Sequence, residues 1–524
     1  MGQSEEAGAH LLVGGGIASL AAAVFLVRDA GVPGERVTVI EALPVPGGSL
    51  DGSGDAESGY LTRGGRMFEP HFACTFALLD GIPSADDPAV SIGADIRAFN
   101  AAVPGASECR LVRDGERAPD RFRLTLGMRD VWDILRLTLT PESRLEGRRI
   151  EDWFRPRFFE SNFWLMWATM FSFRRWHSVA EMRRYLRRFI HLFPGFTRIA
   201  GILRTRYNQN DSVVRPVCAW LEAQGVRIRT GATVADVEIE GDRSARRVTG
   251  LVLASGERVA VAPADRVYLT LGSMTDGSRT GSIAAPPAGQ DAEGPAWQLW
   301  RRVAAHPGLG RPEAFCGAPE RTGWTSFTVT LDSPAFLEFM ERFSGNRTGT
   351  GGLVTFAGSG WTLSIVMLSQ PHFRGQPPSR HVFWGYGLTG ERDGDFVAKP
   401  MAEATGAEIL EELAGQLGLD AAQRAWFAGA RVIPCRMPFI TSQFMPRRRA
   451  DRVPVLPEGA RNFAVIGQYC DLPEDCVFTV EYSVRSAWSA VHAMTGRLAP
   501  PPPVAPTHRD PVVLWRAARV LLAR

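Results

Sequence analysis

Three consecutive glycines, Gly14-Gly15-Gly16, interrupt an apolar run of 17 residues between Leu11 and Val27. The glycine cluster argues against a membrane-spanning helix, which needs about 20 mainly apolar residues in good helical context. The preceding Leu11-Leu12-Val13 predicts a short buried strand, and residues 20–28 are good helix formers. Together these features predict a strand, a glycine turn and a helix, which is the beginning of a dinucleotide-binding unit.

The spacing of this motif assigns a role to each candidate residue. Gly14 permits a tight turn, and Gly16 lets the backbone approach a pyrophosphate. Ile17 and Ala18 begin a helix whose free N–H groups would face the phosphates. A second predicted strand ends at Glu41, which lies 25 residues after Gly16 and is the candidate for binding a ribose hydroxyl.

A second glycine loop, Pro46-Gly47-Gly48-Ser49, follows the predicted acid. Such a loop is typical of flavoproteins, where it passes near the phosphates and the ribityl chain of FAD, so Gly48 and Ser49 are further candidates. No arginine stands beside Glu41, which favours a free ribose hydroxyl over a 2′-phosphate.

The composition narrows the class of protein. The chain has 524 residues, of which 45% are hydrophobic and 22% charged, and this is typical of a soluble globular protein of two to four domains. Its net charge of +3 gives no electrostatic footprint for nucleic acid. Seven scattered cysteines contain no C-x-x-C pair, so we expect no disulfide framework, no metal site and a cytoplasmic location.

We expect an α/β fold in which a Rossmann-like FAD-binding domain carries an inserted mixed α+β substrate domain and a helical region. The boundaries between the parts of this fold are drawn from strand-like runs, helical spacing and a proline stretch. The expected parts are residues 1–95 (FAD-binding, first part), 96–205 (helical insertion lining the substrate site), 206–284 (FAD-binding, second part), 285–435 (substrate-binding), 436–499 (FAD-binding, C-terminal part) and 500–524 (linker and amphipathic helix).

The stretch Gly59–His71, with Ile82-Pro83-Ser84 downstream, closely resembles the oleate hydratase family, also called myosin-cross-reactive antigens. Further family-like blocks follow in the same order, and the resemblance spans residues 9–495. These blocks are Ser161–Trp164, Trp176–Ser178, Met182–Tyr185, Tyr207–Gln209, Gly351–Phe356, Gln370–Phe373, Phe383–Gly387 and Pro438–Phe444. The Met67-Phe68-Glu69 form resembles a monomeric subgroup of that family, which favours a monomer.

This resemblance implies a hydro-lyase. Water would add across the cis double bond of oleate or a similar unsaturated fatty acid to give a 10-hydroxy fatty acid, with FAD as a structural and electrostatic element. By resemblance, Phe68 and Gln209 contact the substrate. The residues that the resemblance adds to the FAD site are Arg63, Gly64, Gly65 and Arg66. Ser273 is a further candidate, because it follows a predicted strand that ends in glycine, as in FAD-binding folds where the chain returns under the nucleotide.

Hydration of an unactivated alkene requires a proton donor and an activated water. By resemblance the donor is Tyr185. The family usually has an acid where this chain has Met67, which cannot accept a proton, so Glu69 is the nearest candidate for activating water. Another carboxylate, or the flavin together with the backbone, could take that role, and Glu69 could instead form a salt bridge with Arg63 or Arg66.

Two apolar segments each have two interpretations. The run Phe163–Phe173 could line a tunnel for the acyl chain or belong to the core. At the C-terminus, Asp510 and Pro511 start a helix with Leu514, Trp515, Ala518, Leu521 and Leu522 on one face. That helix could lie on an anionic membrane surface, as a peripheral contact, or dock on the protein itself.

Two alternative functions also fit the sequence. An FAD-dependent oxidoreductase of the amine-oxidase or carotenoid-desaturase type would share the nucleotide unit and the two-domain plan. A lipid-binding flavoprotein without catalysis would explain Met67.

Overall fold

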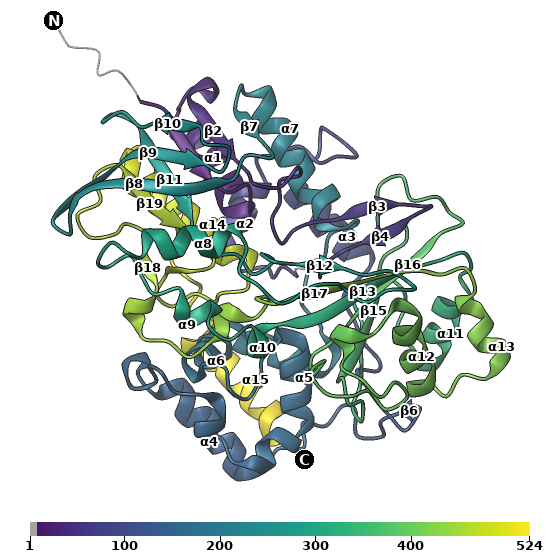
Figure 1. Cartoon of the computed structure of the whole chain (residues 1–524). Coiled ribbons are helices and arrows are strands. Elements are labelled where there is room, and N and C mark those ends of the chain that lie inside the picture. Colours follow the sequence, from purple (N-terminus) through teal and green to yellow (C-terminus); the bar gives the residue numbers. More distant parts are fainter. Residues whose placement is uncertain (1–7, 66, 524) are drawn as a thin grey trace, which may run out of the picture.

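The computed structural model describes residues 8–65 and 67–523. A five-stranded parallel sheet forms the nucleotide-binding half of the fold, in the order β19-β11-β1-β2-β7 (Figure 1). The bounds are β1 His10–Val13, β2 Val37–Ile40, β7 Arg227–Arg229, β11 Arg266–Thr270 and β19 Phe463–Ile466. The strand–turn–helix prediction and the predicted return of the final strand to this sheet are confirmed. The expected Rossmann-like α/β class is also confirmed.

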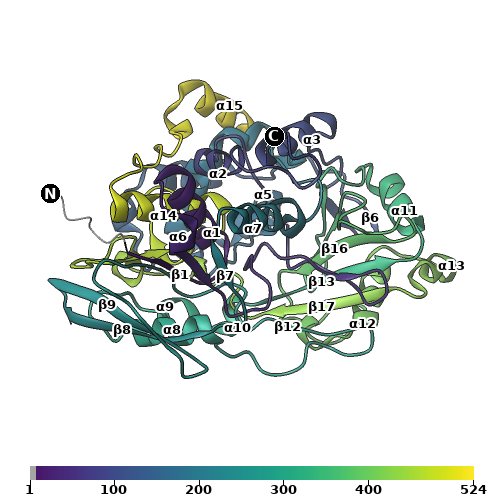
Figure 2. The same cartoon turned by 90° about the horizontal axis from the view of Figure 1, so that it is seen from above.

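Helices and a hairpin cover the two faces of this sheet (Figure 2). Helix α1 (Ile17–Val24) is buried along its whole length, because its small apolar side chains lie between the sheet and α14 (Val480–Thr495). Helix α2 (Ala73–Leu79) also packs on α14, and α7 (Arg215–Ala223) contacts α1. The other face carries the antiparallel sheet of β8 (Val234–Asp242), β9 (Ala245–Leu253) and β10 (Arg258–Ala260).

An eight-stranded mixed sheet forms the second half, in the order β12-β17-β13-β16-β15-β14-β5-β6. Its strands are β5 Leu111–Arg113, β6 Glu116–Arg117, β12 Arg279–Thr280, β13 Trp324–Leu331, β14 Leu353–Phe356, β15 Leu363–Met367, β16 His381–Gly387 and β17 Arg431–Met437. Helices α11 (Ala335–Ser344) and α12 (Gly406–Gln416) share one apolar cluster with this sheet.

The sheet does not follow the boundaries expected from the sequence. Strands β5 and β6 belong to the predicted helical insertion, and β12 belongs to the predicted second FAD part. Helix α8 (Pro295–Val303) falls within the expected substrate range, yet it packs on β8 in the nucleotide-binding half. The turn predicted at Gly241-Asp242 begins two residues later, because Gly241 and Asp242 still belong to β8 and pair with β9.

The segment 96–205 is otherwise mainly helical, as predicted. Its helices are α4 (Met128–Leu139), α5 (Asn162–Phe171), α6 (Val179–Phe189) and the 3₁₀ segment Ile190–Arg198, and α3 (Ile92–Ala102) precedes them. Helix α6 is charged yet buried, because its carboxylate Glu181 lies 2.8 Å from Arg447 and 3.5 Å from Arg452. Such pairing removes most of the penalty of a buried charge.

The remaining elements are short, apart from the C-terminal helix. They are β3 Ser53–Asp55, β4 Gly59–Leu61, α9 Glu313–Cys316, α10 Pro319–Thr322, α13 Ala421–Arg424, β18 Val453–Pro454, β20 Cys470–Asp471 and α15 Pro511–Leu522. Helix α15 contacts the segment Ile190–Arg198 and α4. It buries Ala517 and leaves Val512, Leu514, Trp515 and Leu522 between 41% and 58% exposed, so docking on the protein uses only part of its apolar surface.

No helix within residues 8–65 and 67–523 has the length and hydropathy that crossing a bilayer requires.

Candidate active site

The glycine loops form one wall of a cavity of about 290 Å³ at the carboxyl ends of the parallel strands. Nine of the predicted FAD ligands line it: Gly14, Gly16, Ile17, Ala18, Glu41, Gly48, Ser49, Arg63 and Ser273. Gly14 has φ +92°, a conformation that favours glycine, and the amide of Gly47 donates to the carbonyl of Gly15 at 2.8 Å. The two glycine loops are therefore held against each other.

This cavity fits a dinucleotide phosphate. A Cβ atom on Gly16 would meet nothing within 4 Å, so the backbone there leaves room for a ligand. Among the described residues no side chain caps the start of α1, which leaves its first amides available for an anion. Glu41 stands at the end of β2 and accepts hydrogen bonds from the amides of Gly15 and Leu43.

The arginine–glycine segment that follows β4 lies between this cavity and a second one. Arg63 forms an ion pair with Asp51 at 2.5 Å and lines the nucleotide cavity. Gly65 and Met67 line the second cavity instead. Gly64 has φ +144° and is not among the described residues that line either cavity, and Arg66 lies outside the described residues.

The second cavity has a volume of about 100 Å³ and a wall that is partly apolar. Gln209 and Met67 both line it, together with the polar side chains of Thr205 and Ser369. Arg204 and His372, its two ionisable side chains, were not predicted as site residues. Burial lowers the pKa of His372 to about 3, so its imidazole is neutral at physiological pH.

Arg204 is a buried cation in this wall. Its guanidinium donates to the carbonyl of Thr350 at 2.5 Å and to that of Val103, and its side chain contacts the region of Gly351 and Met67. No carboxylate of a described residue forms an ion pair with it. Burial alone lowers the pKa of Arg204 to about 10, so the side chain remains charged near neutral pH.

Phe68 is 1% exposed and is not among the described residues that line this cavity. Its backbone exchanges two hydrogen bonds with Leu203, at 2.9 and 2.8 Å. This bridge holds the chain that carries Met67 beside the chain that carries Arg204.

Tyr185 lies near the middle of α6 and is 1% exposed. Its ring contacts four phenylalanine rings with centroid distances of 5.0 to 5.7 Å, those of Phe171, Phe173, Phe189 and Phe444. Its hydroxyl donates to the carbonyl of Val477 at 2.6 Å. The next residue, Phe478, donates its amide to Gln468, which lines the nucleotide cavity.

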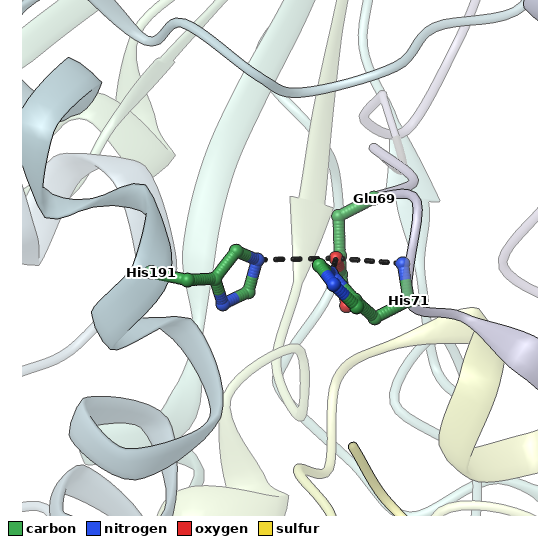
Figure 3. Close-up of side chains that lie close together, drawn as sticks. All are labelled: Glu69, His71 and His191. Carbon is green, nitrogen blue, oxygen red and sulfur yellow. Dashed lines mark hydrogen bonds and ion pairs between the residues drawn. The ribbon is translucent and has the colours of Figure 1, made fainter. Parts of the chain in front are cut away.

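Glu69 lies in a different place from Met67, where it is buried in a cluster with the exposed His71 and the half-buried His191 (Figure 3). One carboxylate oxygen lies 2.9 Å from His71 Nδ1 and 3.3 Å from His191 Nε2, and the other lies 3.2 Å from Arg188. Burial alone would raise the pKa of Glu69, but these partners together hold it below its ordinary value. Glu69 therefore forms a salt bridge with Arg188; of its two expected partners, Arg63 pairs with Asp51 instead and Arg66 lies outside the described residues.

The aromatic run Phe163–Phe173 serves mainly as core. Eight side chains of this run are buried, and only Trp167, Met170 and Phe171 border a narrow apolar space beside α6. Phe189, Leu192 and Phe196 complete that space, and no polar side chain of a described residue lines it. The space lies against Tyr185, because Phe171 and Phe189 contact the tyrosine ring directly.

The sequence matches the family model named MCRA over residues 8–492. The chain belongs to the MCRA family. One similar protein is the oleate hydratase of Streptococcus pyogenes, 38% identical over 92% of this chain and 84% of that protein. Another is the linoleate hydratase of Lactiplantibacillus plantarum, which is 30% identical. The alignment covers 93% of this chain and 93% of that protein.

Solved structures that resemble this MCRA protein show the fold alone. Cyclohexylamine oxidase from Brevibacterium oxydans superposes with a TM-score of 0.52 at 15% identity, covering 93% of this chain and 98% of that one. An oxidoreductase from Methanosarcina mazei gives a TM-score of 0.50 at 13% identity, covering 91% and 99% of the two chains.

Proposed function

We propose that this protein is an FAD-dependent hydratase that adds water across the cis double bond of oleate or a similar fatty acid to give a 10-hydroxy fatty acid. Both named relatives are fatty-acid hydratases. The observation that carries the proposal is the pair of adjoining cavities, because Arg63 lines the nucleotide cavity while Gly65 and Met67 line the second.

FAD would be held by the two glycine loops, with Glu41 at the ribose. When bound, it supplies electrostatic and structural support beside the second cavity. The protein residues supply the remaining parts of the site: the backbone at Gly14 and Gly16 leaves space for the phosphates, and the start of α1 provides amide donors.

Tyr185 is the proposed proton donor. The transition state carries positive charge on carbon, and four phenylalanine rings lie around Tyr185, where aromatic π electrons would stabilise a cation. The proton passes from the phenol to one alkene carbon, and water bonds to the other. The proton that this water loses then returns to the tyrosinate, so the enzyme is restored after each turnover.

The carboxylate of the fatty acid is assigned to the second cavity. Arg204 is a charged group there without a carboxylate partner among the described residues, and Gln209 lies beside it. Burial of the chain would supply most of the affinity, because each methylene contributes about 0.8 kcal/mol. Arg204 would supply the preference for a free acid, because a charged hydrogen bond contributes about 1.5–3 kcal/mol.

Glu69 fits a positioning role better than that of the base. Its lowered pKa makes it a weaker proton acceptor, and His71, His191 and Arg188 lie within 3.3 Å of its two oxygens. We propose that Glu69 orients Arg188 on α6, three residues from Tyr185, and that another group activates the water.

A membrane contact is proposed for two neighbouring helices. On α4, Met128, Trp132, Leu135 and Leu139 are 46% to 74% exposed and lie on one helical face, and α15 adds its own exposed apolar residues beside it. Arginines on both helices complement anionic headgroups. We further propose that the protein is a monomer.

One experiment tests the function. The purified protein, reconstituted with FAD, is incubated with oleate in ¹⁸O-labelled water while dissolved oxygen is recorded. We expect one labelled hydroxyl group in the product and no oxygen consumption. A desaturated product with oxygen uptake would favour the oxidoreductase alternative, and fatty-acid binding without conversion would favour a binding protein.

A further inference from the structure

A cavity of about 580 Å³ lies between α6 and the linker that precedes α15, away from both cavities described above. Its size is in the range of small-molecule sites, about 300–1,000 Å³. Six arginines line it: Arg183, Arg184, Arg187, Arg188, Arg449 and Arg509. The linker residues Pro503, Pro506 and His508 form the opposite wall.

Acidic side chains neutralise only part of this charge. Four carboxylates line the same cavity, those of Glu142, Glu146, Asp471 and Glu474, so six arginines against four acids leave a net charge of +2. Arg184 pairs with Glu142 at 2.6 Å, and Arg449 pairs with Asp471 at 3.0 Å. Arg188 is directed to Glu69 and to Asp475, outside the lining.

Three arginines remain without a close counter-ion. Arg183 has a side chain that is 10% exposed, its nearest carboxylate is Glu142 at 4.0 Å, and its Nε has no hydrogen-bond partner. Among the described residues, neither Arg187 nor Arg509 has a carboxylate within 4.0 Å. Single arginines without a carboxylate of a described residue within 4.0 Å occur elsewhere on the surface, Arg461 for example, whereas these three line one cavity together.

The contact between Arg187 and His508 also indicates an excess of positive charge in the cavity. Arg187 donates a hydrogen bond to Nε2 of His508, which requires that this nitrogen carries no proton. Burial, followed by the charges of Arg187 and Arg509, lowers the pKa of His508, while Glu474 acts in the opposite direction. The cavity therefore keeps its histidine neutral and still has an excess of positive charge.

We propose that this cavity binds the phosphate group of a phosphate monoester, with Arg183, Arg187 and Arg509 as its ligands. Arginine forks match the geometry of phosphate oxygens, and a phosphate monoester carries a charge of about −1.5 to −2 at pH 7, opposite in sign to the excess charge of the cavity. The ester can be a soluble metabolite or a lipid headgroup. The lipid source agrees with the position of the cavity, because the linker leads directly into α15 and its exposed apolar residues.

Calorimetric titration of the full-length, FAD-loaded protein with glycerol 3-phosphate tests the site, and glycerol is the uncharged reference. Arg187→Gln/Arg509→Gln removes two ligands that are partly or fully exposed, so the fold should survive. Arg461→Gln is the matched control, because Arg461 is exposed and does not line the cavity. We expect the wild type and the control to bind equally and the double variant to bind at least about tenfold more weakly.

Vesicles separate the two sources of phosphate. The same three proteins are sedimented with phosphatidylcholine vesicles that contain or lack phosphatidic acid. Binding of glycerol 3-phosphate that the double variant loses identifies a soluble ester. Binding only to phosphatidic acid vesicles, again lost in the double variant, identifies a headgroup. Equal binding by all three proteins, or no binding to either probe, overturns the proposal.

Discussion

Replacing Tyr185 by phenylalanine removes one hydroxyl group and keeps the ring that packs against four phenylalanines. Two effects follow. The carbonyl of Val477 loses its donor at 2.6 Å, and leaving a buried acceptor unpaired costs about 1–3 kcal/mol of folding free energy. The reaction loses its proposed proton donor, which typically lowers a rate by about 10²–10⁴, or about 3–5 kcal/mol of barrier.

These effects are separated by measuring three quantities on the FAD-loaded variant: hydroxy fatty acid formed per minute at saturating oleate, KM, and the free energy of unfolding in urea. We expect kcat to fall by about 10²–10⁴ with KM little changed, because the hydroxyl acts only in the transition state. Flavin absorbance shows whether the cofactor is retained.

Tyr386→Phe is the matched control. Tyr386 is also buried, and its hydroxyl donates to a backbone carbonyl, that of Thr169. It should lose a similar amount of stability and keep its turnover. If Tyr185→Phe kept its kcat, or if Tyr386→Phe lost as much activity, the assignment of Tyr185 as the proton donor would be refuted.

Three further predictions concern charge. Arg204→Met should raise KM for oleate by about tenfold or more and leave KM for methyl oleate unchanged, because only the free acid presents a carboxylate. An equal rise in KM for both substrates would contradict this. Glu69→Gln should reduce kcat by less than tenfold and lower stability, since it weakens the pairing with Arg188 and the histidines; a loss of several orders of magnitude would restore Glu69 as the base. Asp276, at the start of α8, has its pKa raised to about 6, mainly by burial. Because this folded-state pKa exceeds the unfolded value of 3.8, the protonated form stabilises the fold, and that contribution is complete below about pH 4 and lost as pH rises through 6. Relative to Asp276→Asn, the wild type should therefore lose about 2 kcal/mol of unfolding free energy between pH 4 and 7. Urea titrations at pH 4, 5, 6 and 7 would show a constant difference if this were wrong.

The nucleotide-binding half could be predicted because its signal is local. The turn at Gly14, the start of α1 and the acid at the end of β2 lie within about thirty residues, and each depends on backbone conformation that the residue type restricts. The predicted strand at 267–273 and the final strand at 462–468 followed from the same pattern of an apolar run ending in glycine.

The second sheet could be predicted only in part. The strands near 326–331, 352–356 and 381–386 were visible as apolar runs, but β5, β6 and β12 contain two or three residues each and carry no periodic signal. Their pairing is decided by strands more than 150 residues away, such as β12 with β17 and β5 with β14. Domain limits drawn from sequence proximity therefore missed them.

The candidate site, too, could be predicted only in part. Met67 and Gln209 were identified by resemblance, but nothing in the sequence pattern indicated that Arg204 and His372 share a cavity with them. The surroundings of Glu69 could not be inferred, because Arg188 and His191 are about 120 residues further along the chain. Whether a histidine is neutral, and whether an arginine is buried without an acidic partner, depends on tertiary packing.

The shared wall between the nucleotide cavity and the second cavity has a thermodynamic consequence. Arg63 belongs to one side, and Gly65 and Met67 belong to the other, so a ligand that fixes this short stretch on one side reduces its freedom on the other. The two binding equilibria are then linked, and the linkage must be reciprocal: a fatty acid that binds more tightly in the presence of flavin also makes flavin bind more tightly. Lipid in the cell would thereby help to retain the cofactor.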